Sequence, residues 1–555
     1  MCAAKFESPV DRLIYWASVK PDGVFLTQPI NDQTYEYTWS QVLDEVSRVA
    51  QYLARYPQGS HIGIISLNCA HWFMADLAIQ MAGHVSIPIY PTASTDTVNK
   101  ILVHAEVKAV FIGKMFSVKK ALSHLQTAIK DQPIEQLAIY ESYPGIPFWQ
   151  QLVDGNQAIE LPAQHQINDL LSIIYTSGTT GDPKGVMISY RAVQAAINLV
   201  KSVIVINDKD RFVSYLPLAH VAERMAVEFG SLYHGSHVSF IRSLETFTDD
   251  IKAAEPTVFF AVPRIWVKIK AAIETKLGGA RTLKILFSIP WLGQCFKQAL
   301  LRKLGFQNIR YALCAAAPVN KEVLHWFSDL GLKLNEAYGM SETCGLSHMT
   351  QQSDAKMGSV GRVIDGCDCR LTAAGEVLLR NPAMMDGYYK QQELTAETID
   401  TDGWLHTGDL GEIDDEGFLY ITGRNKDIFK TAKGKYISPS PIEQQFHTAL
   451  GVPHLILMGN GFPQPFMVIS THESALVNEP QKLMQICQEQ LSKLNLKLEA
   501  HERLSHIFIS HQNWGVDNGM LTPTLKMKRD AIEKFYLSQA EQLMSSSSES
   551  VLLIH

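Results

Sequence analysis

The run Tyr175-Thr-Ser-Gly-Thr-Thr-Gly-Asp-Pro-Lys-Gly185 decides how this chain is read, because it places three glycines, four small hydroxyl side chains and one lysine between two apolar segments. Glycines let backbone N–H groups approach an anion closely, hydroxyls add donors, and Lys184 adds a positive charge. The apolar residues 170–174 and 186–188 predict a strand on each side, and a helical pattern follows from Ala192 to Val200. We therefore predict a strand-loop-strand hairpin that holds phosphate.

This run differs from the Walker A loop of other nucleotide-binding proteins. A Walker A loop has Gly before its lysine and Ser or Thr after it, whereas Pro183 and Gly185 flank Lys184 here. An ordinary surface loop rich in glycine and hydroxyl residues is the alternative, and the length of the run argues against it.

The run resembles the phosphate-binding signature of the adenylate-forming superfamily, which includes acyl-CoA synthetases, luciferases and the adenylation domains of peptide synthetases. Five further stretches resemble later motifs of that superfamily and follow in the same order. They are Leu-Pro-Leu-Ala-His-Val-Ala-Glu-Arg at 216–224, Asn-Glu-Ala-Tyr-Gly-Met-Ser-Glu-Thr at 335–343, Thr-Gly-Asp-Leu at 407–410, Gly-Arg-Asn-Lys-Asp at 423–427 and Leu-Thr-Pro-Thr-Leu-Lys-Met-Lys-Arg at 521–529. The resemblance thus spans most of the chain.

Composition agrees with a large enzyme. The chain has 555 residues, of which 46% are hydrophobic and 19% charged, and this is enough for more than one domain. A formal net charge of -7 argues against a nucleic-acid partner. The eight cysteines have no spacing that predicts pairing or a zinc site, so we expect free thiols. The start of the chain lacks a signal-peptide pattern, and we expect a cytoplasmic protein.

Strand and helix patterns alternate up to about residue 370, which predicts a layered α/β domain. After Gly366 the pattern changes to short strands and turns, and the charged, glycine-rich residues 424–435 suit a hinge. The predicted fold class is α/β: a large N-terminal domain (1–423) with a distorted β-barrel part, a hinge (424–427), and a small mobile α+β C-terminal domain (428–543). Residues 544–555, which include four consecutive serines, are expected to form a flexible tail.

The resemblance also implies roles for individual residues. The loop residues that would bind ATP are Thr176, Ser177, Gly178, Thr179, Thr180, Gly181 and Lys184. Tyr338 would lie against the adenine, in a nucleotide site that also includes Ala317 and Gly339. Ser341 would donate to the α-phosphate, and Glu342 would hold Mg²⁺ together with Thr176.

The remaining implied roles concern the ribose, the acyl group and coenzyme A. Asp409 would accept both ribose hydroxyls, with Arg424 nearby. His220 would lie between the nucleotide and acyl sites, Lys526 would bridge the substrate carboxylate and the α-phosphate, Gly434 would approach coenzyme A, and Lys426 would be the pivot. Leu525 stands where a glycine often precedes the lysine, so Lys528 is a weaker candidate for the same role.

Each role has a plainer alternative. Asp409 could cap a helix or turn, Tyr338 could be a core aromatic, His220 could be a hydrogen-bonded core histidine, and the two lysines could simply be charges on a solvated loop. Only the ordered series of motifs favours the functional reading of each.

The motif at 216–224 and the stretch Gly434-Lys-Tyr-Ile-Ser-Pro-Ser-Pro-Ile-Glu443 are similar to their forms in long-chain fatty acyl-CoA synthetases. This implies an ATP-dependent, Mg²⁺-dependent ligase that joins a long-chain fatty acid to coenzyme A. The apolar residues between His220 and Phe240 could line the acyl tunnel or form a core helix. Three alternatives stay open: a fatty acyl-AMP ligase that serves a carrier protein, an enzyme for β-hydroxy or aromatic acids, and a non-enzymatic nucleotide-binding scaffold.

The apolar segment Leu283 to Phe296 has lysine and arginine on its flanks. It could make a peripheral contact with the inner membrane surface, although its short length favours a buried insertion helix. The sequence does not predict the oligomeric state.

Overall fold

The structure is a computed structural model of the chain. It describes residues 6–30, 33–115, 125–130, 132–177, 183–351, 355–450, 452, 454–471, 480–522, 526–547 and 549–554. The chain divides into two compact units, each described by itself. The large unit comprises Met1–Cys369, Leu379–Leu405 and Asp415–Leu419, and the small unit comprises Arg370–Leu378, His406–Asp414 and Tyr420–His555.

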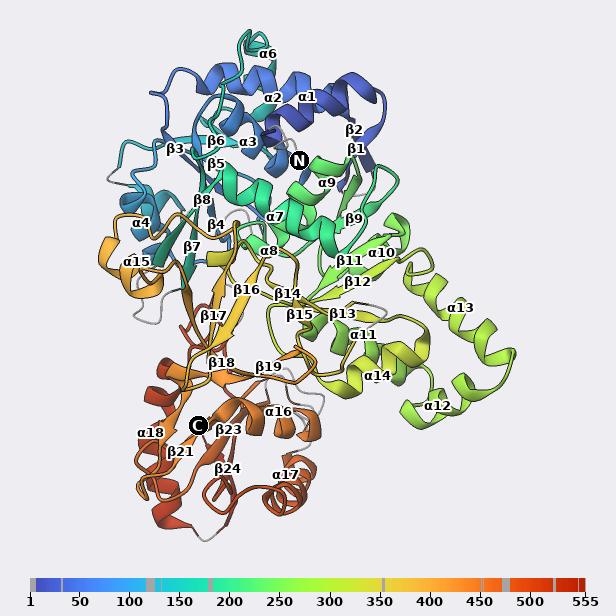
Figure 1. Ribbon diagram of the computed structural model, residues 1–555, viewed down its shortest axis with the longest axis vertical. Helices are drawn as coiled ribbons and strands as arrows, with labels where there is room; N and C mark the ends of the chain where they lie inside the picture. Colours follow the sequence, from blue (N-terminus) through green and yellow to red (C-terminus); the bar gives the residue numbers. More distant parts are fainter. Residues whose placement is uncertain are drawn as a thin grey trace. The chain divides into compact units, whose positions relative to one another are not determined.

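A six-stranded sheet in the large unit contains the predicted hairpin (Figure 1). Its order is β6-β5-β3-β4-β7-β8, and its pairs are parallel except for β7 and β8. The bounds are β3 His61–Ile65, β4 Val85–Ile89, β5 Ala109–Ile112, β6 Glu135–Ala138, β7 Leu170–Ser177 and β8 Pro183–Ser189. Helices α3 (Ala70–Met81) and α4 (Thr95–His104) make the crossovers that parallel strands require.

A second sheet of the large unit has the order β2-β1-β10-β9. Its strands are β1 Val24–Ile30, β2 Gln33–Thr38, β9 Arg211–Ser214 and β10 His237–Phe240. Helices α1 (Pro9–Val19) and α2 (Trp39–Leu53) each begin with a capping box, Ser8 with Asp11 and Thr38 with Gln41. Strand β2 therefore leads directly into α2 at Trp39. Further helices are α6 Trp149–Gly155, α7 Tyr190–Val203 and α10 Phe247–Ala254.

A third sheet, β11-β12-β13-β14-β15, continues the large unit. Strands β11 (Val258–Ala261), β12 (Tyr311–Cys314) and β13 (Leu334–Tyr338) are parallel, whereas β14 (His348–Met349) and β15 (Arg362–Val363) are antiparallel to their neighbours. Helices α11 Pro263–Lys276, α12 Ala280–Ser288, α13 Leu292–Leu304 and α14 Lys321–Leu330 accompany it. The fully buried Trp266 packs edge-on against Phe259 and Phe327, with ring centroids 5.4 and 5.0 Å away.

Short strands follow residue 366, as predicted. The sheet β16-β17-β18-β19 comprises Asp368–Leu371, Glu376–Arg380, Leu405–Ile413 and Leu419–Arg424. Helix α15 (Gln392–Thr398) lies between β17 and β18 in the sequence. The border between the two units runs through these strands.

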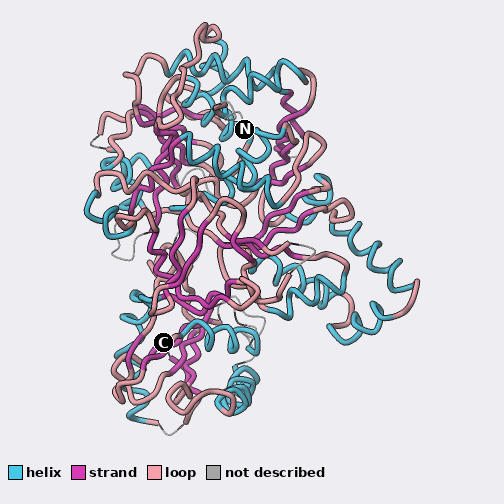
Figure 2. Tube along the Cα trace, viewed as in Figure 1, coloured by secondary structure: helices cyan, strands magenta, loops and turns pink. Residues whose placement is uncertain are grey.

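The small unit is α+β (Figure 2). A two-stranded ribbon, β20 (Phe429–Lys430) with β21 (Tyr436–Ile437), precedes the sheet β22-β23-β24-β25. That sheet comprises His454–Met458, Phe466–Ser470, Ile507–Ser510 and Val551–Ile554, and the helices are α16 Pro439–Leu450, α17 Pro480–Asn495 and α18 Arg529–Ser546. Alternate strand residues contribute to two apolar clusters, one with α16 and α17 and the other with α18, so helices cover both faces.

The expectation of a flexible tail at 544–555 is wrong. Helix α18 extends to Ser546, and Val551–Ile554 forms β25, which pairs in parallel with β24. The serines suggested disorder, but the four apolar residues after them satisfy the edge of β24 and bury Val551 and Ile554.

The predicted fold class is confirmed: the protein is α/β, with a large N-terminal part and a smaller α+β C-terminal part. No disulfide joins the seven cysteines that the structure describes. No helix within the described ranges is long and apolar enough to cross a membrane.

Candidate active site

The hairpin of β7 and β8 confirms the strand-loop-strand prediction. Thr176 pairs with Lys184 and Tyr175 with Gly185 across the two strands. A Cβ atom on Gly185 would lie 2.8 Å from Ile173 Cγ2, so a glycine is needed there for close packing. The loop residues Gly178, Thr179, Thr180 and Gly181, and the side chain of Ser177, lie outside the part of the chain that the structure describes.

A distant segment completes the outer edge of this hairpin. Tyr389 N–H donates to Gly185 O at 2.8 Å, and Met187 N–H donates to Gly387 O at 3.0 Å. These bonds place the ring of Tyr388 beside Lys184, whose Nζ lies 5.6 Å from the ring centroid. The lysine predicted to follow the phosphates is therefore next to an aromatic residue that sequence reasoning missed.

Tyr388 in turn contacts the carboxylate predicted to hold Mg²⁺. Its hydroxyl donates to Glu342 Oε1 at 2.7 Å, and both side chains are buried. Burial, and the charge of Glu342, raise the pKa of the Tyr388 hydroxyl well above its ordinary value, so it stays protonated and remains a donor. Lys184, Tyr388 and Glu342 thus form one continuous group, which we call the Lys-Tyr-Glu cluster.

Glu342 lies in the short helix η2 (Ser341–Thr343), within a tight turn between β13 and β14. A Cβ on Gly339 would lie 2.5 Å from the backbone carbonyl group of Gly345, so no other residue fits at 339 without moving the turn. Gly345 N–H closes the turn by donating to Met340 O at 2.9 Å. The turn fixes Ser341 and Glu342 through the backbone.

Tyr338 ends β13, and its ring centroid lies 5.9 Å from that of His348 on β14. Ala317 follows the neighbouring parallel strand β12 and is exposed. The carboxyl ends of adjacent parallel strands meet at one edge of a sheet, which is where α/β proteins bind ligands. The structure therefore brings Ala317 and Tyr338 to the same sheet edge, as a nucleotide site requires.

The motif at 216–224 begins an irregular helical segment. It comprises α8 (Val221–Glu223), a π-helix η1 (Arg224–Phe229) and α9 (Gly230–His234). His220 caps α8, with Nδ1 accepting from Ala222 N–H at 3.1 Å. A Cβ on Gly345 would lie 3.8 Å from Ala222 Cα, so the turn that carries Glu342 lies against the start of this segment. His220 therefore lies at the start of a segment that contacts the turn carrying Glu342, and its role between two sites stays a prediction.

Arg224, in the π-helix, is the centre of a buried charge network that the sequence did not reveal. Its guanidinium donates to Asp76 at 2.7 Å, to Glu228 at 3.0 Å and to Ser172 of β7 at 2.7 Å, and it is fully buried. Burial raises the pKa of Glu228 well above its ordinary value. The network ties the segment to α3 and to the sheet that carries the phosphate hairpin.

Glu223 forms a second buried polar contact. Its Oε1 accepts from Ser214 Oγ at 2.9 Å and from Tyr215 N–H at 3.0 Å. Burial raises the pKa of Glu223 to about 8. These bonds hold the start of the helical segment against Ser214, at the end of β9, and the backbone of Tyr215 after it.

The small unit carries the other predicted residues. Asp409 lies within β18, and its carboxylate accepts from Arg424 Nε at 2.8 Å. Asp409 therefore lies within a strand and not at the start of a helix, and it is hydrogen-bonded to Arg424, the other residue predicted to meet the ribose. Gly434, at φ +77°, closes the turn between β20 and β21, and Lys426 lies in the short helix η3 (Asn425–Asp427).

Lys526 and Lys528 are both exposed and lie around an isolated bridge between Leu521 and Met527. Thr522 N–H donates to Lys526 O at 2.8 Å, and Lys528 N–H donates to Met520 O at 2.8 Å. Arg529, the next residue, pairs with Glu443 at 2.8 Å and lies 3.8 Å from Asp427, beside the predicted pivot. These backbone hydrogen bonds join residues 520–522 to residues 526–528.

The predicted magnesium ligands are one carboxylate, Glu342, and one hydroxyl, Thr176. Mg²⁺ prefers oxygen ligands, keeps several waters and is commonly bound through one or two carboxylates plus substrate phosphates. The donors fit an ion that arrives with a nucleotide. They do not form a complete protein cage, and no cluster of three or more acidic, histidine or cysteine ligands occurs within the described ranges.

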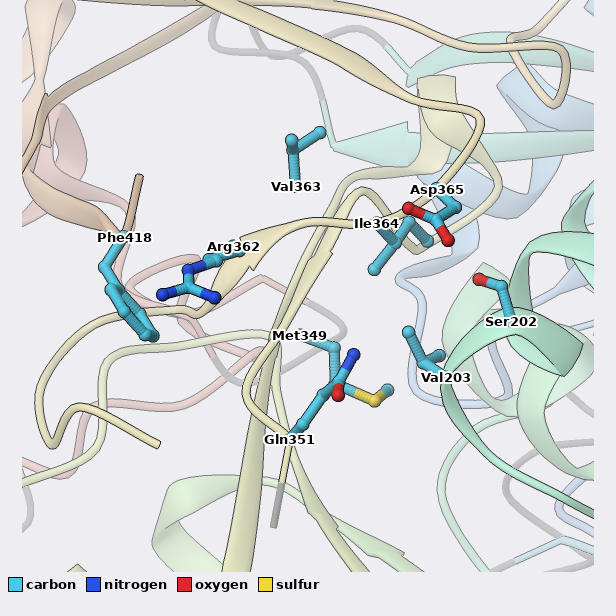
Figure 3. A pocket seen from close by; sticks show the side chains of 9 residues that line it. All are labelled: Ser202, Val203, Met349, Gln351, Arg362, Val363, Ile364, Asp365 and Phe418. Carbon is cyan, nitrogen blue, oxygen red and sulfur yellow. The ribbon is translucent and has the colours of Figure 1, made fainter. Parts of the chain in front are cut away.

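A small pocket lies near β14 and β15 (Figure 3). Its volume is about 90 Å³, too small for a nucleotide. The Arg362 guanidinium lies 4.5 Å from the ring centroid of Phe418, and its Nε donates to Glu416 O at 2.8 Å. The pocket is a polar packing defect that a few waters could fill, and it adds nothing to the site.

Comparison with known proteins defines the class. The family model described as "AMP-binding enzyme" matches residues 14–389, and "AMP-binding enzyme C-terminal domain" matches 426–548. The chain belongs to the AMP-binding enzyme family, so it is an adenylate-forming enzyme, as the motifs predicted.

Two relatives illustrate the sequence similarity. The chain is 31% identical to the peroxisomal long chain acyl-CoA synthetase 6 of Arabidopsis thaliana, over 86% of this chain and 77% of that protein. It is 26% identical to a long-chain-fatty-acid–CoA ligase of Xenopus laevis, over 94% of this chain and 81% of that protein.

Solved structures share the fold. The adenylation domain of a carboxylic acid reductase from Segniliparus rugosus, in complex with AMP and a co-purified carboxylic acid, has a TM-score of 0.80 and 20% identity, covering 97% of this chain and 94% of that one. A fatty acyl CoA synthetase of Mycobacterium tuberculosis has a TM-score of 0.66 and 21% identity, covering 96% of this chain and 99% of that one.

Proposed function

We propose that this protein joins a long-chain fatty acid to coenzyme A through an acyl-adenylate. A carboxylate oxygen of the acid attacks the α-phosphorus of ATP, the bond to the β-phosphate oxygen breaks, and pyrophosphate leaves. The thiol of coenzyme A then loses its proton and attacks the acyl carbon, and AMP leaves with the former carboxylate oxygen. The products are acyl-CoA, AMP and pyrophosphate.

The observation that carries this proposal is the Lys-Tyr-Glu cluster together with its neighbour, the segment that follows His220. In this proposal Lys184 follows the outer phosphates, Glu342 holds Mg²⁺, and Tyr388 keeps Glu342 in one position. Mg²⁺, when bound, neutralises charge that develops on the phosphates. Groups fixed in advance stabilise such a transition state more than they stabilise the substrate.

Fatty acids as the substrate class are supported by the names of the relatives and by the small side chains after His220. Ala222 and Ala226 are half-buried, one helical turn apart, whereas Met225 and Val227 are buried. Small residues along one side of a segment leave room for a chain beside it. The same segment starts next to the turn that carries Glu342, where the acid's carboxylate would react.

In the small unit, Asp409 and Arg424 would meet the ribose, Lys526 would contact the carboxylate and α-phosphate, and Gly434 would approach coenzyme A. In this proposal Asp409, Arg424 and Lys526 act in adenylation, and Gly434 acts in the later step with coenzyme A.

A carrier protein is the second candidate acceptor. It is favoured by one observation, the likeness to a didomain of the same reductase that includes a carrier protein, with a TM-score of 0.81 and 20% identity over 98% of this chain. Every nucleotide contact would be the same in both cases. Only the acceptor of the acyl group differs.

The test is pyrophosphate release from ATP with fatty acids of graded length, with and without coenzyme A, together with detection of the thioester. We expect turnover to require a long-chain acid and to rise with coenzyme A as acyl-CoA forms. Acyl-AMP that accumulates and is unaffected by coenzyme A would instead favour the carrier protein. Turnover only with aromatic or short β-hydroxy acids would overturn the substrate, and no pyrophosphate release with any acid would favour a nucleotide-binding scaffold.

A further inference from the structure

The helical hairpin of α12 and α13 is anchored at its base and exposed at its tip. Leu283 is fully buried in the cluster around Trp266, and Phe287 and Phe296 pack against that cluster. The residues at the turn between the helices are exposed instead, with Trp291 at 77% and Leu292 at 57%. In Figure 1 the two helices extend away from the sheet β11-β12-β13 of the same unit.

The two readings of this segment from the sequence concern different parts of it, the helices and the turn that joins them. The helices bury one side as an insertion would, and Ile289, Pro290, Trp291 and Leu292 form an apolar surface, which we call the hairpin tip. Exposed apolar surface of this kind is unfavourable in water, and burying it against a partner would lower the free energy. Among the four residues of the tip, Trp291 has the largest side chain and would bury the most surface.

The backbone at the tip is strained. Trp291 has φ +59° and ψ −55°, and Leu292 N–H donates to Pro290 O at 2.7 Å, so the three residues form a γ-turn centred on Trp291. A bulky residue with positive φ is rare, because its Cβ approaches its own backbone. The turn holds the indole outward at the end of the hairpin.

The stretch of sequence that contains this hairpin is basic. From Thr275 to Lys321 the sequence contains no aspartate or glutamate and eight lysines and arginines, although the whole chain has 56 acidic and 49 basic residues. On α13, Arg302 and Lys303 are exposed in the last turn, at the end of the helix away from the tip, and Lys297 Nζ lies 5.4 Å from the ring centroid of Phe287. An apolar tip on a stretch of sequence whose charged residues are all basic is complementary to an anionic lipid surface.

We propose that the hairpin tip inserts into the interface of an anionic phospholipid bilayer, and that the basic residues of α13 are attracted to the lipid headgroups. Tryptophan is well suited to that position, because its ring is apolar and its N–H can bond to the headgroup region. The apolar contacts supply insertion, and the charges supply attraction that salt weakens. The tip residues take no part in the proposed reaction, although a membrane would supply fatty acids to the enzyme.

The experiment is flotation of the full chain with vesicles of phosphatidylcholine, with and without phosphatidylglycerol, at low and high salt. We expect binding to the phosphatidylglycerol vesicles that decreases with salt. The double variant Trp291→Ser, Leu292→Ser should bind about tenfold less or weaker still. The matched control, Leu161→Ser with Leu244→Ser, changes two residues that are 84% and 61% exposed elsewhere, and should bind as the unchanged protein does.

A second pair of variants tests the charges. Arg302→Glu with Lys303→Glu should weaken the preference for phosphatidylglycerol, whereas Lys493→Glu with Lys497→Glu, which reverses two exposed lysines of the small unit, should leave it unchanged. Thermal unfolding and turnover of dissolved substrate check that each variant folds and works. Binding by the tip variant equal to that of its control would overturn the proposal. So would a tip variant that changes the oligomeric state without lipid, since the tip would then be an interface between copies.

Discussion

The hydroxyl group of Tyr388 donates a hydrogen bond to Oε1 of Glu342 at a distance of 2.7 Å. The two residues are 46 positions apart, and backbone bonds from residues 387 and 389 to β8 hold Tyr388 in place. One side of the tyrosine ring faces Lys184 and its hydroxyl faces Glu342. The contact therefore links the phosphate hairpin to the predicted magnesium ligand.

Replacing Tyr388 by phenylalanine should slow adenylation. A hydrogen bond to a charged group is commonly worth about 1.5 to 3 kcal/mol, so we expect pyrophosphate release to fall roughly 10- to 100-fold and the requirement for Mg²⁺ to rise. The measurement is the rate of pyrophosphate release against Mg²⁺ concentration. Tyr389→Phe is the control, because the hydrogen bond that ties Tyr389 to the hairpin comes from its backbone. If the Mg²⁺ dependence is unchanged in Tyr388→Phe, Tyr388 does not position a magnesium ligand and the role of Glu342 in holding Mg²⁺ is contradicted.

Lys526→Ala should slow acyl-AMP formation by a few orders of magnitude. The charge contact that it removes is commonly worth about 3 to 4 kcal/mol at the transition state. Thioester formation from supplied acyl-AMP should survive better. The backbone of Lys526 forms hydrogen bonds with Thr522 that do not involve the lysine side chain, so the variant should fold normally. Lys528→Ala is the comparison in the same loop. Equal loss in both half-reactions would make Lys526 structural, and a larger loss with Lys528→Ala would move the role to that residue.

Local patterns predicted the parts of the site that depend on nearby residues. The glycines and apolar flanks of residues 170–188 predicted β7 and β8, because strand and turn preferences act over a few positions. Tyr388 could not be found in this way, since its place depends on pairing with β8 across some two hundred residues. A Gly-Tyr-Tyr sequence in a loop, at 387–389, was the only local signal.

The segment after His220 shows the same limit. Its apolar residues predicted a helix, but a period near 3.6 does not distinguish an α-helix from the wider turns of η1. The buried contacts of Arg224 with Asp76, Glu228 and Ser172 involve three elements, and no sequence spacing connects them. The serines at 545–548 likewise led to the prediction of a flexible tail. Strand β25 forms because it pairs with β24, and the local sequence does not show that pairing.

Ala226→Leu should shorten the preferred acyl chain. Ala226 is half-buried, whereas the adjacent Val227 is only 2% exposed, so added volume at 226 would enter the space beside the segment and added volume at 227 would strain the core. We expect a shift toward shorter acids with an unchanged requirement for ATP. Val227→Leu should instead lower the unfolding temperature with little change in chain length. An identical chain-length profile in a well-folded Ala226→Leu variant would assign Ala226 to the core.

Glu223 should make the protein less stable as the pH rises from about 5 to 8. Its pKa is raised to about 8 in the folded protein against an ordinary value of 4.5, so in this range the folded state holds a proton that the unfolded state has lost. The free energy of unfolding then falls with pH, by at most about 1.4 kcal/mol per unit from this group. Glu223→Gln keeps an acceptor for Ser214 and removes the titration. Denaturant unfolding at several pH values should give a shallower slope for Glu223→Gln, and an equal slope would mean that Glu223 is ionised when folded.

Lys426→Pro tests the predicted pivot. Adenylation and thioester formation need different groups at one reaction centre, so we expect the C-terminal part to rotate between them. Hinges absorb such rotations over a few residues, and proline fixes φ near −65°. Pyrophosphate release should be nearly normal in the first turnover, with acyl-AMP accumulating, while acyl-CoA formation falls severely.

The neighbouring ion pair provides the matched variant. Asp427 lies 3.8 Å from Arg529, which follows the Lys526 loop, so Asp427→Asn alters the contact beside the pivot without restricting the backbone. We expect Asp427→Asn to affect the two half-reactions about equally, because it removes a charge near the loop and leaves φ free to change. The measurement is the pair of rates on one preparation of each variant. A proportional fall of both rates in Lys426→Pro would mean that the linker is distorted, and two unchanged rates would remove Lys426 as the pivot.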